Sequence, residues 1–437
     1  MSSSCKNNKG GLSRRRFLYL TGAGSIAFLA GCATHPVTGR PRLMLVSEQQ
    51  EIEVDRENSP HQISADYGRS QDSGLNEYVA QVGSEIAEQG HRPDMPYAFN
   101  ALNATYINAY AFPGGTLGVS RGILLELENE AELASLIGHE VGHVAARHTA
   151  QRMTRGILTS VALTGLVVAA DPEWEPVVGG LGAIGAGALL AGYSRSQERE
   201  ADELGLEYMA AADYHPRGFV GLMEMLKEMS GRDRSFLEVM FATHPMSSER
   251  YQTAVSRAEE YSQRDRRIYR ERYMDNTASL RQIREGIERM QEGDERMSAK
   301  EPEKAREHYA KALDTAPEDY AANLKMAKCQ LGLEEPGEAE KYALAAREIY
   351  PEEPQALHIL GMAHISRQKY EEALAQFDSY KEKLPGNPNT VFFQGYSLEG
   401  MGRRSRAAEK YQRYLQQVRE GEYARHARNR LEQWGYI

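Results

Sequence analysis

The sequence predicts an α+β protein in which a mainly helical domain with a small sheet is followed by an all-α solenoid of repeats. Two observations support this prediction. Up to about residue 260, segments with a helical period of apolar residues surround one stretch with strand character. From residue 286 onward, small residues and prolines return at a fixed spacing of 34 positions.

The composition is that of a globular protein and not of a nucleic-acid binder. The chain has 437 residues, of which 41% are hydrophobic and 26% are charged, enough for two or three domains with sizeable cores. Its formal net charge is -10, whereas a general nucleic-acid binder needs a basic surface. We therefore expect no nucleic-acid partner.

Residues 1–31 have the features of an export signal. A basic start precedes a short apolar stretch, residues 17–30, which is too short for a spanning helix of the mature protein. The run SRRRFL, residues 13–18, resembles a twin-arginine export motif, and LAGC, residues 29–32, resembles a lipobox. These resemblances imply that Cys32 becomes the lipidated first residue. The alternative is a simple N-terminal membrane anchor.

Residues 32–46 are expected to be a lipidated tether that leads into a first helix. Without residues 1–31, the chain keeps only Cys32 and Cys329. Since Cys32 would be acylated, the sequence offers neither a disulfide framework nor a cysteine-based zinc site.

Residues 47–260 show the mixed pattern of an α+β domain. Residues 75–89 have helical periodicity. Residues 97–124 have the pattern of strands around a Pro113-Gly114-Gly115 turn. A further helix is expected to begin at Asn129, where the sequence matches a capping box.

Two apolar stretches, residues 157–170 and 177–191, follow this helix. Each is shorter than the roughly 18–20 residues of a membrane-spanning helix, and the second is rich in glycine and alanine. We expect buried or membrane-grazing helices here and not true membrane spans.

Residues 286–437 contain an internal repeat with a period of 34 residues. The columns that keep this period are Gly293, Ala327, Gly361 and Gly395; Ala305, Ala339, Ala373 and Ala407; and Pro317, Pro351 and Pro385. The pattern resembles tetratricopeptide repeats, which implies about four helix pairs and a capping helix in a solenoid whose concave face recruits partners. Residues 261–285 are expected to be a helical connector with a solvated charged face.

The run SLIGHEVGHVAARH, residues 135–148, places ionisable side chains on an apolar helix. His139 and His143 are four positions apart and therefore lie on one helix face, so both imidazoles can bind one zinc ion. Glu140 lies one position round the helix, close to the ion without pointing at it, which suits a base that activates water. Gly142 in the helix interior predicts that another backbone or a substrate passes close by.

An HExxH motif needs a third ligand, and the best candidate lies downstream. The metzincin extension fails, because Ala146 and Thr149 stand where glycine and histidine are required. His148 lies one position before the place where that histidine is required, and it is expected at the surface. Glu198 and Asp202 are four positions apart on a second predicted helix. Glu198 would be the third ligand, and Asp202 would hydrogen-bond a ligating histidine. Without the HExxH motif, these carboxylates would be interpreted as part of an acidic helix face exposed to solvent.

Four segments together resemble the M48 family of zinc metallopeptidases: HExxH, a later ExxxD, NAYAFPGG upstream and THPMSSER downstream. The resemblance covers roughly residues 40–260. It implies a zincin-like fold of the gluzincin type, with one zinc ion per chain bound by His139, His143 and Glu198. It also implies peptide-bond hydrolysis with Glu140 as general base and then acid. The repeats resemble those of periplasmic members, whereas the N-terminal segment resembles lipoprotein members.

Two further sites follow from this resemblance. Asn108, Ala109 and Tyr110 match the family's strand beside the cleft, to which an extended substrate can add by backbone pairing. His244 and Arg250 match the family's HP…R segment and are further catalytic candidates. His244 is expected to donate a hydrogen bond to the oxyanion, or to fill the fourth zinc position and close the site. The third alternative is an ordinary loop histidine.

The resemblance and the repeats together imply a class of substrate. The expected activity is hydrolysis of unfolded or misassembled envelope proteins in the periplasm, with the repeats also a candidate contact for the outer-membrane assembly machinery. Ala33 after Cys32 gives no retention signal by the usual enterobacterial rule, which favours lipid anchoring at the outer membrane. The alternative is a non-proteolytic assembly factor with a latched or silent zinc site. An intact Glu140 argues against full silence.

Overall fold

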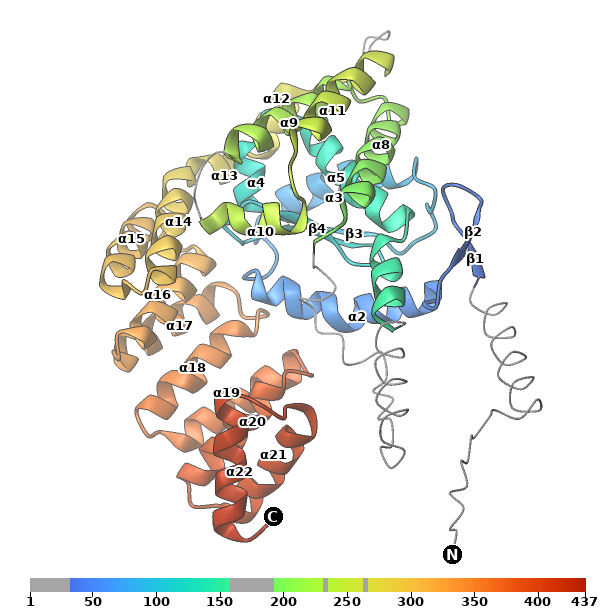
Figure 1. Ribbon diagram of the computed structural model, residues 1–437. Coiled ribbons are helices and arrows are strands. Elements are labelled where there is room, and N and C mark those ends of the chain that lie inside the picture. Colours follow the sequence, from blue (N-terminus) through green and yellow to red (C-terminus); the bar gives the residue numbers. More distant parts are fainter. Residues whose placement is uncertain (1–31, 158–191, 231–234, 262–265) are drawn as a thin grey trace, which may run out of the picture.

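The computed structural model describes residues 32–157, 192–230, 235–261 and 266–437 (Figure 1). They form a helical domain around a small sheet, from which helix pairs continue as an arc to the C-terminus. The predicted fold class, a mainly helical α+β domain followed by an all-α repeat solenoid, is confirmed.

Two of the sequence predictions fall on other parts of the chain. The predicted export signal, residues 1–31, lies outside the described residues. So do the second apolar stretch and all of the first except Ile157. Among the helices that the structure describes, none combines the length and the apolar character needed to cross a bilayer.

The segment that was expected to be a tether is folded against the domain. Cys32 pairs with Leu43 in an antiparallel hairpin. Met44 and Val46, directly after the hairpin, are buried in a cluster with side chains of the sheet. The elements of this region are β1 (Cys32–Thr34), β2 (Pro41–Leu43) and α2 (Glu48–Ala65).

The small sheet has three strands in the order β3-β5-β4, so β4 lies at an edge. β3 is parallel to β5, and β4 is antiparallel to it. The predicted turn joins β4 to β5, and Gly115 has a φ of 103°, a conformation that favours glycine. The elements are α3 (Ser73–Ala87), β3 (Ala98–Leu102), β4 (Ala109–Ala111) and β5 (Thr116–Ser120), as the sequence predicted.

Two helices cross at very short range in the centre of the domain. They are α5 (Glu130–Ala145), which begins after the predicted cap Asn129, and α8 (Arg195–Ala211). A Cβ atom on Gly142 would lie 3.0 Å from the carbonyl oxygen of Ala201, and one on Gly138 would lie 2.9 Å from that of Gly205. The prediction that another backbone passes close to Gly142 is confirmed.

The connector toward the repeats is a solvated charged face only in part, since some of its side chains pack against the domain. Tyr273 is fully buried, Arg272 forms an ion pair with the buried Glu130, and Arg281 donates to the carbonyl of Leu127 at 2.7 Å. Arg272 and Arg281 therefore bind the connector to the domain. Further helices of this part are α4 (Arg121–Glu126), α9 (Arg217–Met229), α10 (Ser235–Thr243), α11 (Ser248–Tyr261), α12 (Arg270–Asn276) and α13 (Ala278–Gln282).

The repeats are antiparallel helix pairs, and their small residues lie where helices cross. A Cβ atom on Gly293 would lie 2.3 Å from the ring of Tyr309, and one on Gly361 would lie 2.5 Å from that of Phe377. The helices are α14 (Arg284–Ser298), α15 (Pro302–Thr315), α16 (Tyr320–Gly332), α17 (Pro336–Ile349), α18 (Gln355–Ser366), α19 (Tyr370–Lys383), α20 (Pro388–Gly400), α21 (Arg404–Gln417) and α22 (Glu422–Trp434).

The first repeats share a core with the sheet domain. One hydrophobic cluster extends from Leu75 in α3 to Cys329 in α16. Polar contacts cross the same boundary between Arg121 and Asp319, Ser64 and Glu353, and Thr105 and Asp294. The solenoid is therefore built onto the domain and not merely linked to it.

Removing the Arg121 side chain is expected to destabilise the protein. Its Nη1 and Nη2 lie 2.5 and 3.1 Å from the buried carboxylate of Asp319. Arg121→Ala would leave that carboxylate unpaired, at a cost of about 3–5 kcal/mol in the free energy of unfolding. The control is Arg257→Ala, whose ion pair with Glu203 is exposed and contributes roughly 0–1 kcal/mol. Urea unfolding measures both, and equal losses would contradict the prediction.

Candidate metal centre

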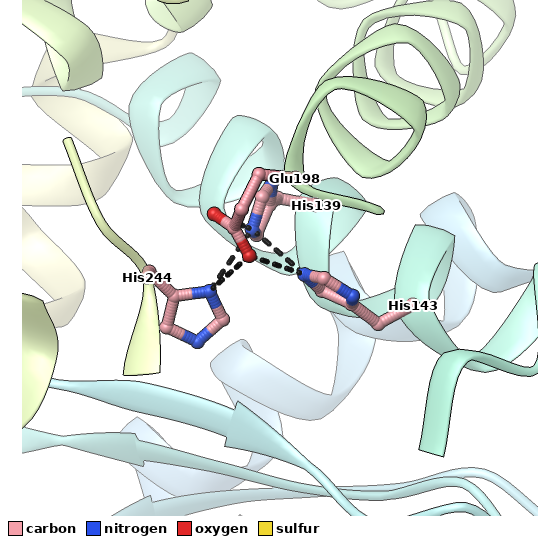
Figure 2. A group of neighbouring side chains, drawn as sticks. All are labelled: His139, His143, Glu198 and His244. Atoms are coloured by element: carbon pink, nitrogen blue, oxygen red, sulfur yellow. Dashed lines mark hydrogen bonds and ion pairs between the residues drawn. The ribbon is translucent and has the colours of Figure 1, made fainter. Parts of the chain in front are cut away.

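Four buried side chains from three parts of the chain meet at one point (Figure 2). His139 and His143 project from α5, Glu198 comes from the first turn of α8, and His244 directly follows α10. Their nearest ligand atoms lie within 4.8 Å of one another. The structure thus brings together the three ligands predicted from the sequence and His244, the candidate for the fourth position.

Four of the distances between ligand atoms in this cluster are close to those expected around one bound zinc ion. His139 Nε2 lies 3.1 Å from His143 Nε2 and 3.3 Å from His244 Nδ1. Glu198 Oε1 lies 3.3 Å from His143 Nε2 and 3.2 Å from His244 Nδ1. Ligands bound at 2.0–2.1 Å around a tetrahedral ion are separated by about 3.3–3.4 Å. Lone pairs of facing imidazoles repel each other, and a shared cation removes that repulsion, so the donor set suits zinc.

The surroundings of Glu198 and His143 favour the protonation states that bind metal. Burial alone would raise the pKa of Glu198, but the imidazoles of His244, His143 and His139 outweigh it and hold that pKa well below its ordinary value. Burial lowers the pKa of His143 well below its ordinary value. A carboxylate and a neutral imidazole are the protonation states that ligate zinc.

Glu140 lies beside the cluster without belonging to it. Its Oε1 is 3.6 Å from His244 Nε2, and its Oε2 has no hydrogen-bond partner among the described residues. Burial raises the pKa of Glu140. A buried carboxyl group with an open acceptor oxygen, next to the metal ligands, is placed to exchange a proton there.

Asp202 and Arg250 support the ligands from behind. Asp202 Oδ1 lies 2.9 Å from His139 Nδ1, as expected of a carboxylate that orients a ligating histidine. Arg250 donates to both oxygens of Asp202 at 2.7 Å and lies 2.7 Å from Glu198 Oε2. It also donates to the carbonyl of Pro245 at 3.1 Å. Its guanidinium is thus engaged in holding other residues, which favours a positioning role over a direct catalytic one.

Comparison with known proteins assigns the domain that carries this cluster. Residues 73–258 match peptidase family M48, and residues 296–362 match the tetratricopeptide repeat. This chain carries an M48 peptidase domain. The prediction of a metallopeptidase domain followed by tetratricopeptide repeats is therefore confirmed, and M48 peptidases are metal-dependent.

Curated relatives are similar over the M48 domain. The β-barrel assembly-enhancing protease of Yersinia pestis is 28% identical over 190 residues, 42% of this chain and 39% of that protein. Metalloprotease YcaL of Escherichia coli is 28% identical over 208 residues, 47% of this chain and 76% of that protein. Mitochondrial metalloendopeptidase OMA1 of Arabidopsis thaliana is 31% identical over 164 residues, 38% of this chain and 32% of that protein.

The match to the first of these relatives is partial. The chain covers about two fifths of the length of the β-barrel assembly-enhancing proteases. Among solved structures, YrrB, described as a tetratricopeptide-repeat protein, is similar over 48% of this chain and 91% of its own, with 17% identity and a TM-score of 0.32.

The expectation that His148 lies at the surface of the M48 domain is wrong. His148 is fully buried, and its Nδ1 lies 2.8 Å from Nδ1 of His143. The cause is local: α5 ends at Ala145, and Arg147 has a φ of 56°, which turns the chain back toward the cluster. Helical periodicity cannot predict such a left-handed residue.

Tyr193 also belongs to the site, although no sequence pattern indicated it. Its ring stacks on His143 with centroids 3.8 Å apart. Its hydroxyl lies 3.1 Å from Oγ1 of Thr149, and its backbone N–H donates to the carbonyl of Thr243 at 3.1 Å. Tyr193 therefore joins the HExxH helix to the segment that carries His244.

The predicted substrate strand is an edge strand, but its side chains face inward. Asn108, Ala109 and Tyr110 are all buried. The hydroxyl of Tyr110 donates to the buried carboxylate of Asp66 at 2.7 Å. If a substrate pairs with this strand, it uses the backbone and not these side chains, and the strand must first become accessible.

One zinc ion per chain is expected in the purified protein. His143→Ala removes a ligand from the centre of the cluster, so its zinc content should fall well below one. His426→Ala in the repeats is the control and should keep its zinc, because His426 lies on α22, outside the cluster. Metal analysis after gel filtration measures both, and undiminished zinc in His143→Ala would exclude this ligand set.

Proposed function

We propose that this protein is a zinc-dependent endopeptidase of the bacterial cell envelope that cleaves unfolded or misassembled proteins. The observation that supports it best is the convergence of His139, His143 and Glu198 with Glu140 beside them. The names of the relatives, a β-barrel assembly-enhancing protease and other metalloproteases, support both the reaction and the setting.

Peptide-bond hydrolysis at this site would require a metal ion and the residues around it. A zinc ion held by His139, His143 and Glu198 would supply a Lewis acid for the scissile carbonyl and lower the pKa of water. Glu140 is placed to accept a proton from the attacking water and to return it to the leaving amine. Burial raises the pKa of Glu140, which makes its protonated form a more accessible state for the second step.

An extended chain is the substrate form that suits this site. β4 is an edge strand of the sheet, and a peptide can add to such an edge by main-chain hydrogen bonds. Backbone pairing does not depend on the side chains of the substrate, so the site would accept peptides of many sequences provided that they are unfolded. Selectivity would then come from the concave face of the repeats, which would recruit the substrate proteins. The same face is a candidate contact for the outer-membrane assembly machinery.

We propose that His244 acts as a latch on this site. Its Nδ1 faces the other ligands, at 3.2 Å from Glu198 Oε1, while its Nε2 faces Glu140. An imidazole in this position would fill the fourth zinc site and displace the water that hydrolysis needs. This closed arrangement also favours the second candidate function, an assembly factor that binds clients while its zinc site stays latched.

Lipid attachment at Cys32 would place the enzyme on the periplasmic side of a membrane, with the outer membrane favoured. Cys32 begins the hairpin of β1 and β2, which lies against the M48 domain. A lipid at this position would hold the domain close to the membrane surface, and no long tether would separate the two.

Replacing Glu140 by glutamine tests the proposed reaction. Glu140→Gln keeps the shape of the site but removes the proton acceptor, so casein cleavage should fall by roughly 10²–10⁴-fold. Its zinc content should stay at the wild-type level. The matched control is Glu203→Gln on the exposed face of α8, which should cleave normally. If Glu140→Gln cleaves at the wild-type rate, Glu140 is not the base.

Replacing His244 by alanine tests the latch. If only about a tenth of the molecules are open at any time, removing the latch should raise casein cleavage and self-cleavage by on the order of 10-fold. His215→Ala, in a histidine–proline pair outside the cluster, is the control. A fall in kcat by roughly 10²–10³ would instead identify an oxyanion donor. An unchanged rate with full zinc content would exclude both roles.

A further inference from the structure

The two ligating histidines of α5 receive support of different kinds. His139 Nδ1 lies 2.9 Å from a carboxylate oxygen of Asp202. His143 Nδ1 instead lies 2.8 Å from another imidazole nitrogen, Nδ1 of His148. A metal-ligating histidine usually donates its second ring N–H to a carboxylate, a carbonyl or water. The carboxylate for His143 therefore has to be sought beyond His148.

The other ring nitrogen of His148 lies beside such a carboxylate. Its Nε2 lies 3.2 Å from Oε2 of Glu200. Glu200 lies on α8, two positions after the ligand Glu198, and its side chain is 30% exposed. His143, His148 and Glu200 thus form a continuous row that runs from the metal cluster to the surface.

Only one arrangement of protons satisfies this row when His143 binds a metal. His143 must present a bare Nε2 to the ion, so its proton is on Nδ1 and is donated to His148. Nδ1 of His148 must then be bare, and its proton is on Nε2, where it is donated to Glu200. Each donor has one acceptor, and the row ends on a negative charge.

We propose that His148 and Glu200 are positioning residues that fix the tautomer and ring orientation of His143. They would do for His143 what Asp202 does for His139, through one additional imidazole. This inference rests on the zinc site of the proposed function and deepens it, because it assigns zinc affinity to residues that are not among the fixed positions of the HExxH and ExxxD motifs.

The surroundings of His148 fit this role better than that of a space-filling side chain. His148 is fully buried while both of its ring nitrogens have polar partners. Tyr193 stacks on His143 and limits its rotation from the other side. The hairpin between β1 and β2 approaches the outer end of the row, where Nε2 of the buried His35 lies 3.8 Å from Oε1 of Glu200. The two histidines of the row are therefore enclosed by packing, and Glu200 ends it near the surface.

The test is the zinc dissociation constant, measured on the full chain by competition with a chromogenic chelator. His148→Phe removes the row and should weaken zinc binding by roughly 10–100-fold. His148→Asn keeps an acceptor for His143 and should recover part of that loss. Glu200→Gln removes the charge at the end of the row and should weaken binding less than His148→Phe does. Glu203→Gln, exposed on the same helix, is the matched control and should bind like the wild type.

Thermal unfolding of the metal-free proteins separates positioning from folding. A positioning role predicts weaker zinc binding in Glu200→Gln with an apo Tm equal to that of Glu203→Gln. If His148→Phe does not fold, this comparison decides alone, and equal zinc affinities of the two glutamine variants would overturn the inference. A wild-type chain that binds zinc but cleaves no peptide would refute the proposed function and leave the inference standing. A folded wild-type chain that binds no zinc would overturn both.

Discussion

The close crossing of α5 and α8 is the constraint on which the metal centre depends. Gly138 and Gly142 on one helix meet Ala201 and Gly205 on the other, and no Cβ atom at these glycines would fit without displacement of the opposing backbone. This approach brings Glu198 opposite His139 and His143, at 3.3 Å from His143 Nε2. A capping box of Ser194 and Gln197 begins α8 one residue before Arg195, which fixes Glu198 in the first turn.

The metal centre also depends on the pairing of its buried charged groups with groups of opposite charge. Glu198 has essentially no exposed surface, and an isolated carboxylate there would be very costly to bury. Arg250 binds it together with Asp202, and Asp202 in turn holds His139. Burial alone would raise the pKa of Asp202, but its hydrogen bonds to Arg250 and His139 outweigh it and lower that pKa. Asp202 and Arg250 thus fix the positions of His139 and Glu198 without belonging to the cluster of ligating side chains.

The sequence predicted the parts of this site that follow from helical spacing. HExxH on an apolar helix, Glu198 and Asp202 one turn apart on another, and the glycine that admits a second backbone all depend on the 3.6-residue period. The repeats could be predicted because small residues return every 34 positions. Gly293 and Gly361 are two of these residues, and each lies against an aromatic ring of the paired helix. Periodic features of the chain could therefore be predicted from the sequence.

What the sequence could not predict depends on contacts between distant segments or on single backbone angles. His148 reaches His143 because Arg147 adopts a positive φ, which no periodic pattern encodes. Tyr193 follows an apolar stretch and has no motif of its own. The core shared by the first repeats and the M48 domain joins residues more than two hundred positions apart, such as Leu75 and Cys329. The hairpin at Cys32 looked like a tether because its strands are only three residues each.

The central claim is that imidazoles and a carboxylate of this chain bind one zinc ion in a tetrahedral site. X-ray absorption spectroscopy at the zinc edge tests it most directly. We expect four nitrogen or oxygen ligands at about 2.0–2.1 Å, with the multiple scattering of histidine rings and no sulfur. Cys329 cannot contribute, because it lies buried in α16, outside the cluster of ligating side chains. A sulfur shell near 2.3 Å, or a six-coordinate oxygen shell without imidazole scattering, would contradict the site described here.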